Sequence, residues 1–203
     1  PVVMLQYSGP TSQRVLNNWR KRFGYALADA GYLVVNVDGR GTGARGREWR
    51  NATYMQLGIK EAEDQISAAK YLKTLPYVDG ERIAICGWSY GGYQALMCLS
   101  LQAKSGDVFK CGIAIAPVTN WRLYDSAYTE RFMRRPQVNE FGYEGTDLMK
   151  MAKDLTGELL IVHGLADDNV HAQNTLLYTD ALVKAGKQFD MQLYVDDNHS
   201  IRN

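Results

Sequence analysis

A serine stands between two glycines in the G-x-S-x-G segment 87–91, directly after a short apolar run, 83–86, that is rich in β-branched residues. A helix-competent stretch, 93–101, follows it. Strand, sharp turn and helix in this order predict that Ser89 is a nucleophile at the tip of a strained turn, where the flanking glycines avoid a clash between strand and helix. The amide of Tyr90 and the positive end of the helix can then face an oxyanion. An incidental serine in a glycine-rich turn is the alternative.

A serine hydroxyl is a weak nucleophile at neutral pH, so Ser89 needs a base, and the base needs a group that fixes its tautomer. After such a turn, the acid and then the histidine follow in the chain, each just past the end of a strand. His199 follows the last expected strand and fits this order, although a solvated terminal histidine is the alternative. Asp167 and Asp168 both lie in the loop after the preceding strand, and their position does not choose between them.

Alternating apolar runs and helix-like segments must position these residues. The expected strands are 1–7, 32–37, 83–86, 111–116, 158–162 and 189–195, and the expected helices are 18–30, 59–75, 93–101 and 171–185. In the helix 59–75 the apolar residues recur at helical spacing, and four charged residues lie off that face: Glu61, Glu63, Asp64 and Lys70. This alternation implies one α/β domain with a mostly parallel sheet and helices on both faces.

The segment 119–153 interrupts the alternation and indicates an insertion over a site more than a part of the sheet. It holds many charges and six aromatic residues: Trp121, Tyr124, Tyr128, Phe132, Phe141 and Tyr143. Such a cluster would suit a flat apolar ring beside a scissile bond. Plain core packing explains dense aromatic residues equally well.

Composition excludes several classes of protein. The 203 residues are 46% hydrophobic and carry 23 basic and 22 acidic side chains, for a net charge of +1. No basic stripe is present, so nucleic acid and anionic membrane are not expected partners, and no apolar run is long enough to predict a membrane span. The three histidines lack a metal-ligand spacing, and the glycine-rich loop 38–43 lacks the nucleotide-binding patterns, so neither metal nor cofactor is expected. The three cysteines are expected to be buried free thiols.

Four segments carry a resemblance: Gly-Trp-Ser-Tyr-Gly-Gly-Tyr at 87–93, His-Gly-Leu-Ala-Asp-Asp-Asn-Val-His at 163–171, Tyr-Asp-Ser-Ala-Tyr-Thr-Glu-Arg-Phe-Met at 124–133, and Asp-Gly-Arg-Gly-Thr-Gly at 38–43. Together they resemble the prolyl oligopeptidase family of serine peptidases, and most closely its dipeptidyl peptidase IV branch. The similarity runs through nearly the whole chain. It implies an α/β-hydrolase fold over 1–203, with 119–153 inserted over the active site, in the C-terminal part of a longer bacterial protein whose β-propeller is absent from this sequence.

The resemblance also implies roles for individual residues. The triad would be Ser89, Asp167 and His199, and Tyr7 would join the amide of Tyr90 in the oxyanion hole. Asn169 would contact a substrate carbonyl. The apolar pocket that receives proline would be formed by Tyr90, Val118, Trp121, Tyr124, Tyr128 and Val170.

The function implied is that of a serine exopeptidase that releases Xaa-Pro dipeptides, and Xaa-Ala more weakly, through an acyl-enzyme. Its partners would be peptides with proline at the second position, and the family also implies a homodimer and a periplasmic or extracellular location. The family's β-propeller carries the acidic residues that hold the substrate's amino terminus, and its chain continues beyond residue 203 into a closing helix. The alternatives are a related acylaminoacyl peptidase or endopeptidase, an esterase, a non-catalytic interaction module, and a fragment without activity of its own.

Overall fold

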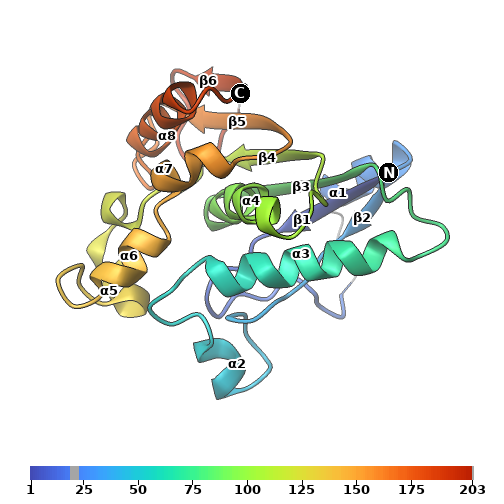
Figure 1. The fold of residues 1–203 in the computed structure, drawn as a ribbon, viewed down its shortest axis with the longest axis horizontal. Coiled ribbons are helices and arrows are strands. Elements are labelled where there is room, and N and C mark those ends of the chain that lie inside the picture. The colour runs from blue at the N-terminus through green and yellow to red at the C-terminus, as the bar shows by residue number, and fades with distance from the viewer. Residues whose placement is uncertain (19–22, 203) are drawn as a thin grey trace.

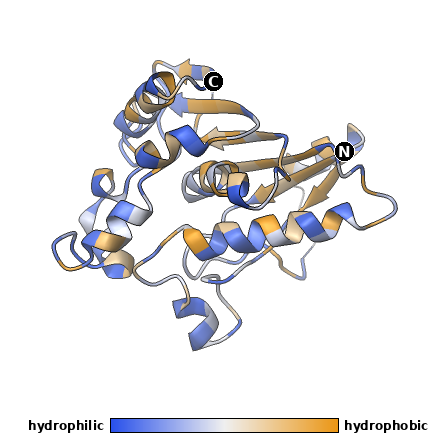
Figure 2. Ribbon diagram, viewed as in Figure 1, coloured by the Kyte–Doolittle hydropathy of each residue, from blue (hydrophilic) through white to orange (hydrophobic). Residues whose placement is uncertain are grey.

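The computed structural model describes residues 1–18 and 23–202. Within this part of the chain, six strands form one sheet in the order β2-β1-β3-β4-β5-β6, and all neighbouring strands are parallel (Figure 1). The strands are β1 (Val2–Gln6), β2 (Leu33–Val35), β3 (Ile83–Trp88), β4 (Cys111–Ile115), β5 (Glu158–Gly164) and β6 (Asp190–Tyr194). Most of the sheet is apolar, as Figure 2 shows, which confirms the predicted α/β class with a parallel sheet.

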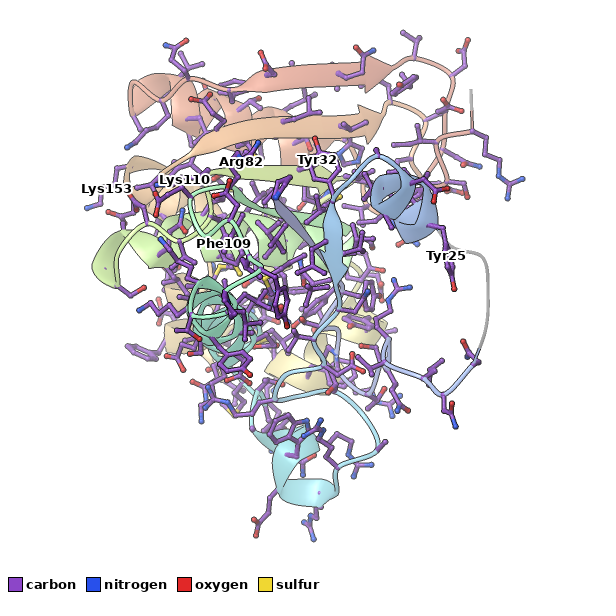
Figure 3. The ribbon with its side chains drawn as sticks, turned by 90° about the vertical axis from the view of Figure 1, so that its right-hand side faces the viewer. Tyr25, Tyr32, Arg82, Phe109, Lys110 and Lys153 are labelled. Atoms are coloured by element: carbon purple, nitrogen blue, oxygen red, sulfur yellow. The ribbon has the colours of Figure 1, made fainter. Side chains whose placement is uncertain are left out.

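Helices lie on both faces of the sheet. They are α1 (Phe23–Asp29), α2 (Arg47–Asn51), α3 (Ile59–Lys73), α4 (Tyr90–Leu101), α5 (Ser126–Met133), α6 (Glu140–Gly145), α7 (Leu148–Met151) and α8 (Gln173–Lys184), with short 3-10 turns η1 (Gln102–Lys104), η2 (Trp121–Leu123) and η3 (Ala152–Asp154). Figure 3 shows α3, α4 and α8 on one side of the sheet and α1 on the other. None of the described helices is long and apolar enough to cross a bilayer.

The two faces are covered unequally. Helix α4 packs against β3, β4 and α3, and its residues 90–100 are all buried. On the opposite face, α1 has no buried residue, and the outward residues of the central strands are only half-buried: Ile113, Ile115, Leu160 and Val162. Figure 3 shows the contrast, because Phe109 lies among crowded side chains whereas Tyr25 projects outward from α1. The main core therefore lies on the α4 side.

Several predicted bounds differ from the observed ones. Helix α1 begins at Phe23 rather than at 18, and residues 19–22 of the predicted helix lie outside the described residues. Helix α8 begins at Gln173, two residues after its predicted start. The sequence did not predict α2, because five mostly polar residues have no apolar periodicity. Of the three free cysteines, two are buried as expected, but Cys111 is only half-buried.

The prediction for Glu61 of α3 was wrong. Its side chain is completely buried rather than turned to solvent. One carboxyl oxygen, Oε2, accepts the backbone N–H of the N-cap residue Gly58 at 2.9 Å and so satisfies one of the free backbone N–H groups at the start of α3. The other, Oε1, accepts the hydroxyl of Tyr90 at 2.7 Å. Glu63 is exposed as predicted, whereas Asp64 is half-buried against Arg40, which it pairs with at 2.7 Å.

Candidate active site

The turn between β3 and α4 has the strain that the sequence predicts. Ser89 has φ 59° and ψ −118°, a conformation that a residue with a side chain rarely adopts, and α4 begins at the next residue, Tyr90. A Cβ added at Gly87 would lie 2.2 Å from the carbonyl oxygen of Gly91, and one added at Gly91 would lie 2.5 Å from that of Gln6. Both glycines are therefore required where strand and helix cross, and Ser89 stands at the tip.

The carboxyl group of Asp167 collects four hydrogen-bond donors. Its Oδ1 accepts the backbone N–H groups of Asn169 and Val170, both at 2.9 Å. Its Oδ2 lies 2.7 Å from Nδ1 of His199 and 3.3 Å from Nε2 of His163. Burial alone would raise the pKa of Asp167, but the hydrogen bonds from the two histidines and the amides outweigh it and hold that pKa well below its usual value. Asp167 is therefore a fixed carboxylate.

The structure separates the two neighbouring aspartates that the sequence left open. Asp167 is buried and bonds His199, whereas the side chain of Asp168 is exposed. The loop of His199 also lies beside the turn of Ser89, because the indole N–H of Trp88 donates to the His199 carbonyl oxygen at 3.0 Å. Among the described residues no hydrogen bond joins the Ser89 hydroxyl to the imidazole. Such contacts often tighten only when substrate binds.

His163 lies next to Asp167. Its ring is fully buried at the end of β5, with Nε2 2.8 Å from the carbonyl oxygen of Val170 and Nδ1 2.7 Å from the hydroxyl oxygen of Thr175. Because a carbonyl only accepts, Nε2 must carry a hydrogen, and that hydrogen also faces Asp167. Sequence reasoning gave His163 no role, and its place directly after a buried apolar run was the only available signal.

Aromatic side chains from 119–153 pack against Tyr90. The Trp121 ring lies 5.4 Å from the Tyr90 ring, and Tyr128 stacks on Trp121 at 6.3 Å between centroids. All six residues predicted to form the apolar pocket belong to or pack on one cluster: Tyr90, Val118, Trp121, Tyr124, Tyr128 and Val170. Asn169 joins them, because its Oδ1 accepts the hydroxyl of Tyr124 at 2.8 Å. This aromatic cluster and the Asp167 loop are thus directly connected.

Tyr7 follows β1 and lies beside the same turn. Its ring centroid is 5.9 Å from that of Tyr90, and the guanidinium carbon of Arg14 lies over the ring, 5.0 Å from its centroid. Burial raises the pKa of Tyr7 above its usual value, against a smaller opposing effect of Arg14. The hydroxyl therefore keeps its proton at neutral pH and can donate a hydrogen bond.

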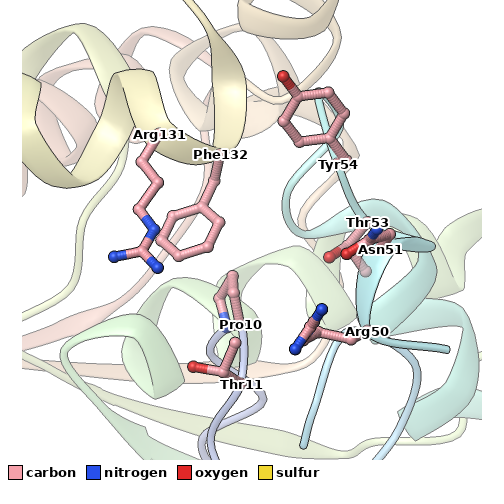
Figure 4. A pocket seen from close by; sticks show the side chains of 8 residues that line it. All are labelled: Pro10, Thr11, Arg50, Asn51, Thr53, Tyr54, Arg131 and Phe132. Atoms are coloured by element: carbon pink, nitrogen blue, oxygen red, sulfur yellow. The ribbon is translucent and has the colours of Figure 1, made fainter. Parts of the chain in front are cut away.

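A separate hollow of about 370 Å³ adjoins this cluster (Figure 4). Two arginine side chains, Arg50 and Arg131, are among its walls, which are completed by Pro10, Thr11, Asn51, Thr53, Tyr54 and Phe132. The Phe132 ring lies 4.9 Å from that of Tyr128, so the hollow borders the aromatic cluster, and the residues that line it do not include the serine turn. Within the described residues, no three His, Cys, Asp or Glu side chains gather as they would around a metal ion.

A parallel α/β sheet, a serine on a strained strand-to-helix turn, and an aspartate–histidine pair on later loops together define an α/β hydrolase of the serine type. The comparison with family models identifies the family within this class. Residues 19–203 match the model of the prolyl oligopeptidase family, and the chain belongs to that family.

Known relatives cover the whole of this chain but are much longer. The chain is 49% identical to a "Probable dipeptidyl-aminopeptidase B" of Metarhizium robertsii and 50% identical to one of Pyrenophora teres f. teres, over 99% of its length and 22% of theirs. Among solved structures, dipeptidyl peptidase 4 of Porphyromonas gingivalis matches with a TM-score of 0.95 and 57% identity, over all of this chain and 28% of that one. The chain thus spans about a quarter of these relatives.

Proposed function

We propose that the protein carrying this chain is a serine exopeptidase that releases N-terminal Xaa-Pro dipeptides, and Xaa-Ala dipeptides more weakly, through an acyl-enzyme. The observation that carries the proposal is the 2.7 Å contact between His199 and Asp167, on loops beside the strained turn of Ser89. The names of the relatives support the dipeptidyl specificity.

In the proposed mechanism, the Ser89 hydroxyl oxygen attacks the scissile carbonyl while its proton passes to Nε2 of His199. Nε2 is the free ring nitrogen because Nδ1 is bonded to Asp167, whose carboxylate also stabilises the imidazolium that forms. The amide of Tyr90 and the hydroxyl of Tyr7 face the tetrahedral oxyanion. The imidazolium then protonates the leaving amine, and the same histidine activates the water that hydrolyses the acyl-enzyme.

The aromatic pocket supplies the proline preference. A pyrrolidine ring is flat and apolar, and it would pack against the half-buried ring of Tyr128, which stacks on Trp121. Alanine at the same substrate position would bury less apolar surface, which is a loss of ~1–3 kcal/mol per methylene in such pockets. Asn169 would donate to a substrate carbonyl through its amide nitrogen, since its Oδ1 already accepts from Tyr124.

In this proposal residues 1–203 form the peptidase domain and 119–153 lie over its active site. Recognition of the substrate's charged amino terminus would come from residues outside this chain, which covers 22% of its curated relatives. The homodimer and the periplasmic or extracellular location stay predictions from the family resemblance.

Substrate competition tests the proposal on the protein at its natural length. We expect kcat/KM for an Xaa-Pro anilide to exceed that for the matched Xaa-Ala anilide roughly tenfold or more, as the pocket's extra contacts require. An amino-terminally blocked Xaa-Pro anilide should be cleaved poorly. Preference for a plain acyl ester would instead indicate an esterase, and efficient cleavage of the blocked peptide would indicate an acylaminoacyl peptidase or endopeptidase.

Tyr7→Phe should lower kcat about 10²–10³-fold, because it removes one oxyanion donor while the ring keeps its contact with Tyr90. KM should change little, since the hydroxyl acts mainly on the transition state. Steady-state kinetics on an Xaa-Pro anilide measures both constants, with Tyr25→Phe on the exposed helix α1 as the matched control. A rise in KM at constant kcat would contradict the oxyanion role.

A further inference from the structure

A completely buried carboxyl group lies behind the proposed site. Glu61 of α3 has no exposed surface, and its two oxygens meet the backbone N–H of Gly58 and the hydroxyl of Tyr90, at 2.9 and 2.7 Å. Tyr90 in turn is the residue after Ser89, its amide opens α4, and its ring packs on Trp121. A single side chain therefore links the start of α3 to the residue that both walls the aromatic pocket and faces the oxyanion.

Within the described residues, no ion pair involves Glu61. Its electrostatic partners include Asp64 of α3, Tyr90, Tyr93 and Cys98 of α4, and Tyr128 of α5, all of which are acidic groups. Burial raises the pKa of Glu61 to about 8, although the bonds from Tyr90 and Gly58 oppose that rise. Glu61 is consequently mostly neutral at pH 7 and becomes an anion above pH 8.

We propose that Glu61 is a positioning residue for the reaction at Ser89: from its buried place at the start of α3 it fixes Tyr90 through the hydroxyl, and so holds the residue whose amide faces the oxyanion. This inference rests on the proposed function. In the neutral state Oε2 still accepts from Gly58, and the protonated Oε1 donates across the 2.7 Å contact to the Tyr90 oxygen, so the carboxyl group orients Tyr90 at no electrostatic cost to the transition state. In the ionised state its charge would oppose the oxyanion across a poorly solvated core, where Coulomb interactions are screened less than in water.

The expected signature is an alkaline fall in the reactivity of Ser89 that depends on Glu61. A fluorophosphonate probe reports that reactivity directly. It has no amino group, so no titration of the substrate contributes to the pH profile. In the protein at its natural length, the labelling rate should fall about three- to tenfold between pH 7 and pH 9.5. Glu61→Gln stays neutral at every pH, and its amide can still accept from Gly58 and donate to the Tyr90 oxygen. It should therefore match the wild type at pH 7 and exceed it at pH 9.5.

Two further variants test the role of Glu61 independently of Glu61→Gln. Tyr90→Phe removes the hydrogen bond that favours the ionised carboxylate, so the alkaline fall should move to higher pH. This shift decides the question if Glu61→Gln does not fold. Glu63→Gln, at an exposed position two residues away on the same helix, should keep the wild-type profile.

The outcomes separate this inference from the proposed function. Labelling at Ser89 with the same alkaline fall in wild type and Glu61→Gln would overturn the role of Glu61 alone, as would an unshifted fall in Tyr90→Phe. Absence of labelling at Ser89 would refute the proposed function and this inference with it. Failure to cleave Xaa-Pro substrates, with the labelling profile as expected, would refute only the proposed specificity.

Discussion

Ser89→Ala should lower kcat of the protein at its natural length by about 10⁶, because without the nucleophile no acyl-enzyme forms and only binding and the oxyanion donors remain. The fold should survive the change. The strained φ of 59° belongs to the backbone of the turn, and alanine occupies less space than serine at the half-buried tip. A large loss of activity without loss of structure is therefore expected.

Labelling with a fluorophosphonate probe measures the loss of the nucleophile, and hydrolysis of an Xaa-Pro anilide measures the loss of turnover. Ser105→Ala, at an exposed position just after α4, is the control and should label and turn over like the wild type. Thermal unfolding of Ser89→Ala should match that of the control. Near-normal turnover in Ser89→Ala would show that another residue is the nucleophile.

Asp167→Asn should lower kcat by about 10⁴, whereas Asp168→Asn should change it less than threefold. The two residues are adjacent and chemically identical, but only Asp167 receives the imidazole of His199, at 2.7 Å, and only Asp167 is buried. An asparagine amide in its place would offer either a weaker acceptor or an N–H that forces the wrong tautomer of the histidine. The pair of variants thus measures the orienting role against a matched neighbour.

Anilide hydrolysis between pH 5 and pH 9 checks this second prediction. The pKa of Asp167 lies well below its usual value, so the carboxylate stays ionised through this range, and the loss in Asp167→Asn should persist at every pH. Below the usual aspartate pKa, the stability that the ionised Asp167 contributes to the wild type should fade as its folded-state pKa is approached. Equal losses in both variants would contradict the assignment.

Much of the fold was predictable because its signals are local. The strands β3, β4 and β5 are apolar runs closed by glycine, proline or polar residues, and their alternation with helices sufficed to predict a parallel sheet. The start of α4 was not predictable from propensity, since Gly91 and Gly92 disfavour helix. Helix α4 nevertheless begins at Tyr90, because the strained turn leads directly into it.

For the candidate site, the sequence suggested the residue types but not the hydrogen bonds that hold them. The order of the acid and the histidine follows from the fold, yet the choice of Asp167 over Asp168 depends on where two backbone amides and two imidazoles point. The sequence analysis placed Glu61 off the apolar face of α3, where a glutamate side chain is normally solvated. The structure buries it because Gly58 and Tyr90 supply its hydrogen bonds.

The packing of β1 against the turn of Ser89 joins segments that are far apart in the sequence. The side-chain amide of Gln6 donates to the carbonyl oxygen of Gly91, a partner 85 positions away in sequence, and β1 pairs with β3 along its whole length. The chain must lose the entropy of closing this long loop before the contacts can stabilise it, so the pairing of β1 with β3 is intrinsically slow. Tyr7 cannot reach the turn of Ser89 before β1 has paired with β3. In the proposed mechanism, a nascent or partly unfolded chain would therefore lack the oxyanion donor of Tyr7, and the gain of that donor would report the completion of the central sheet.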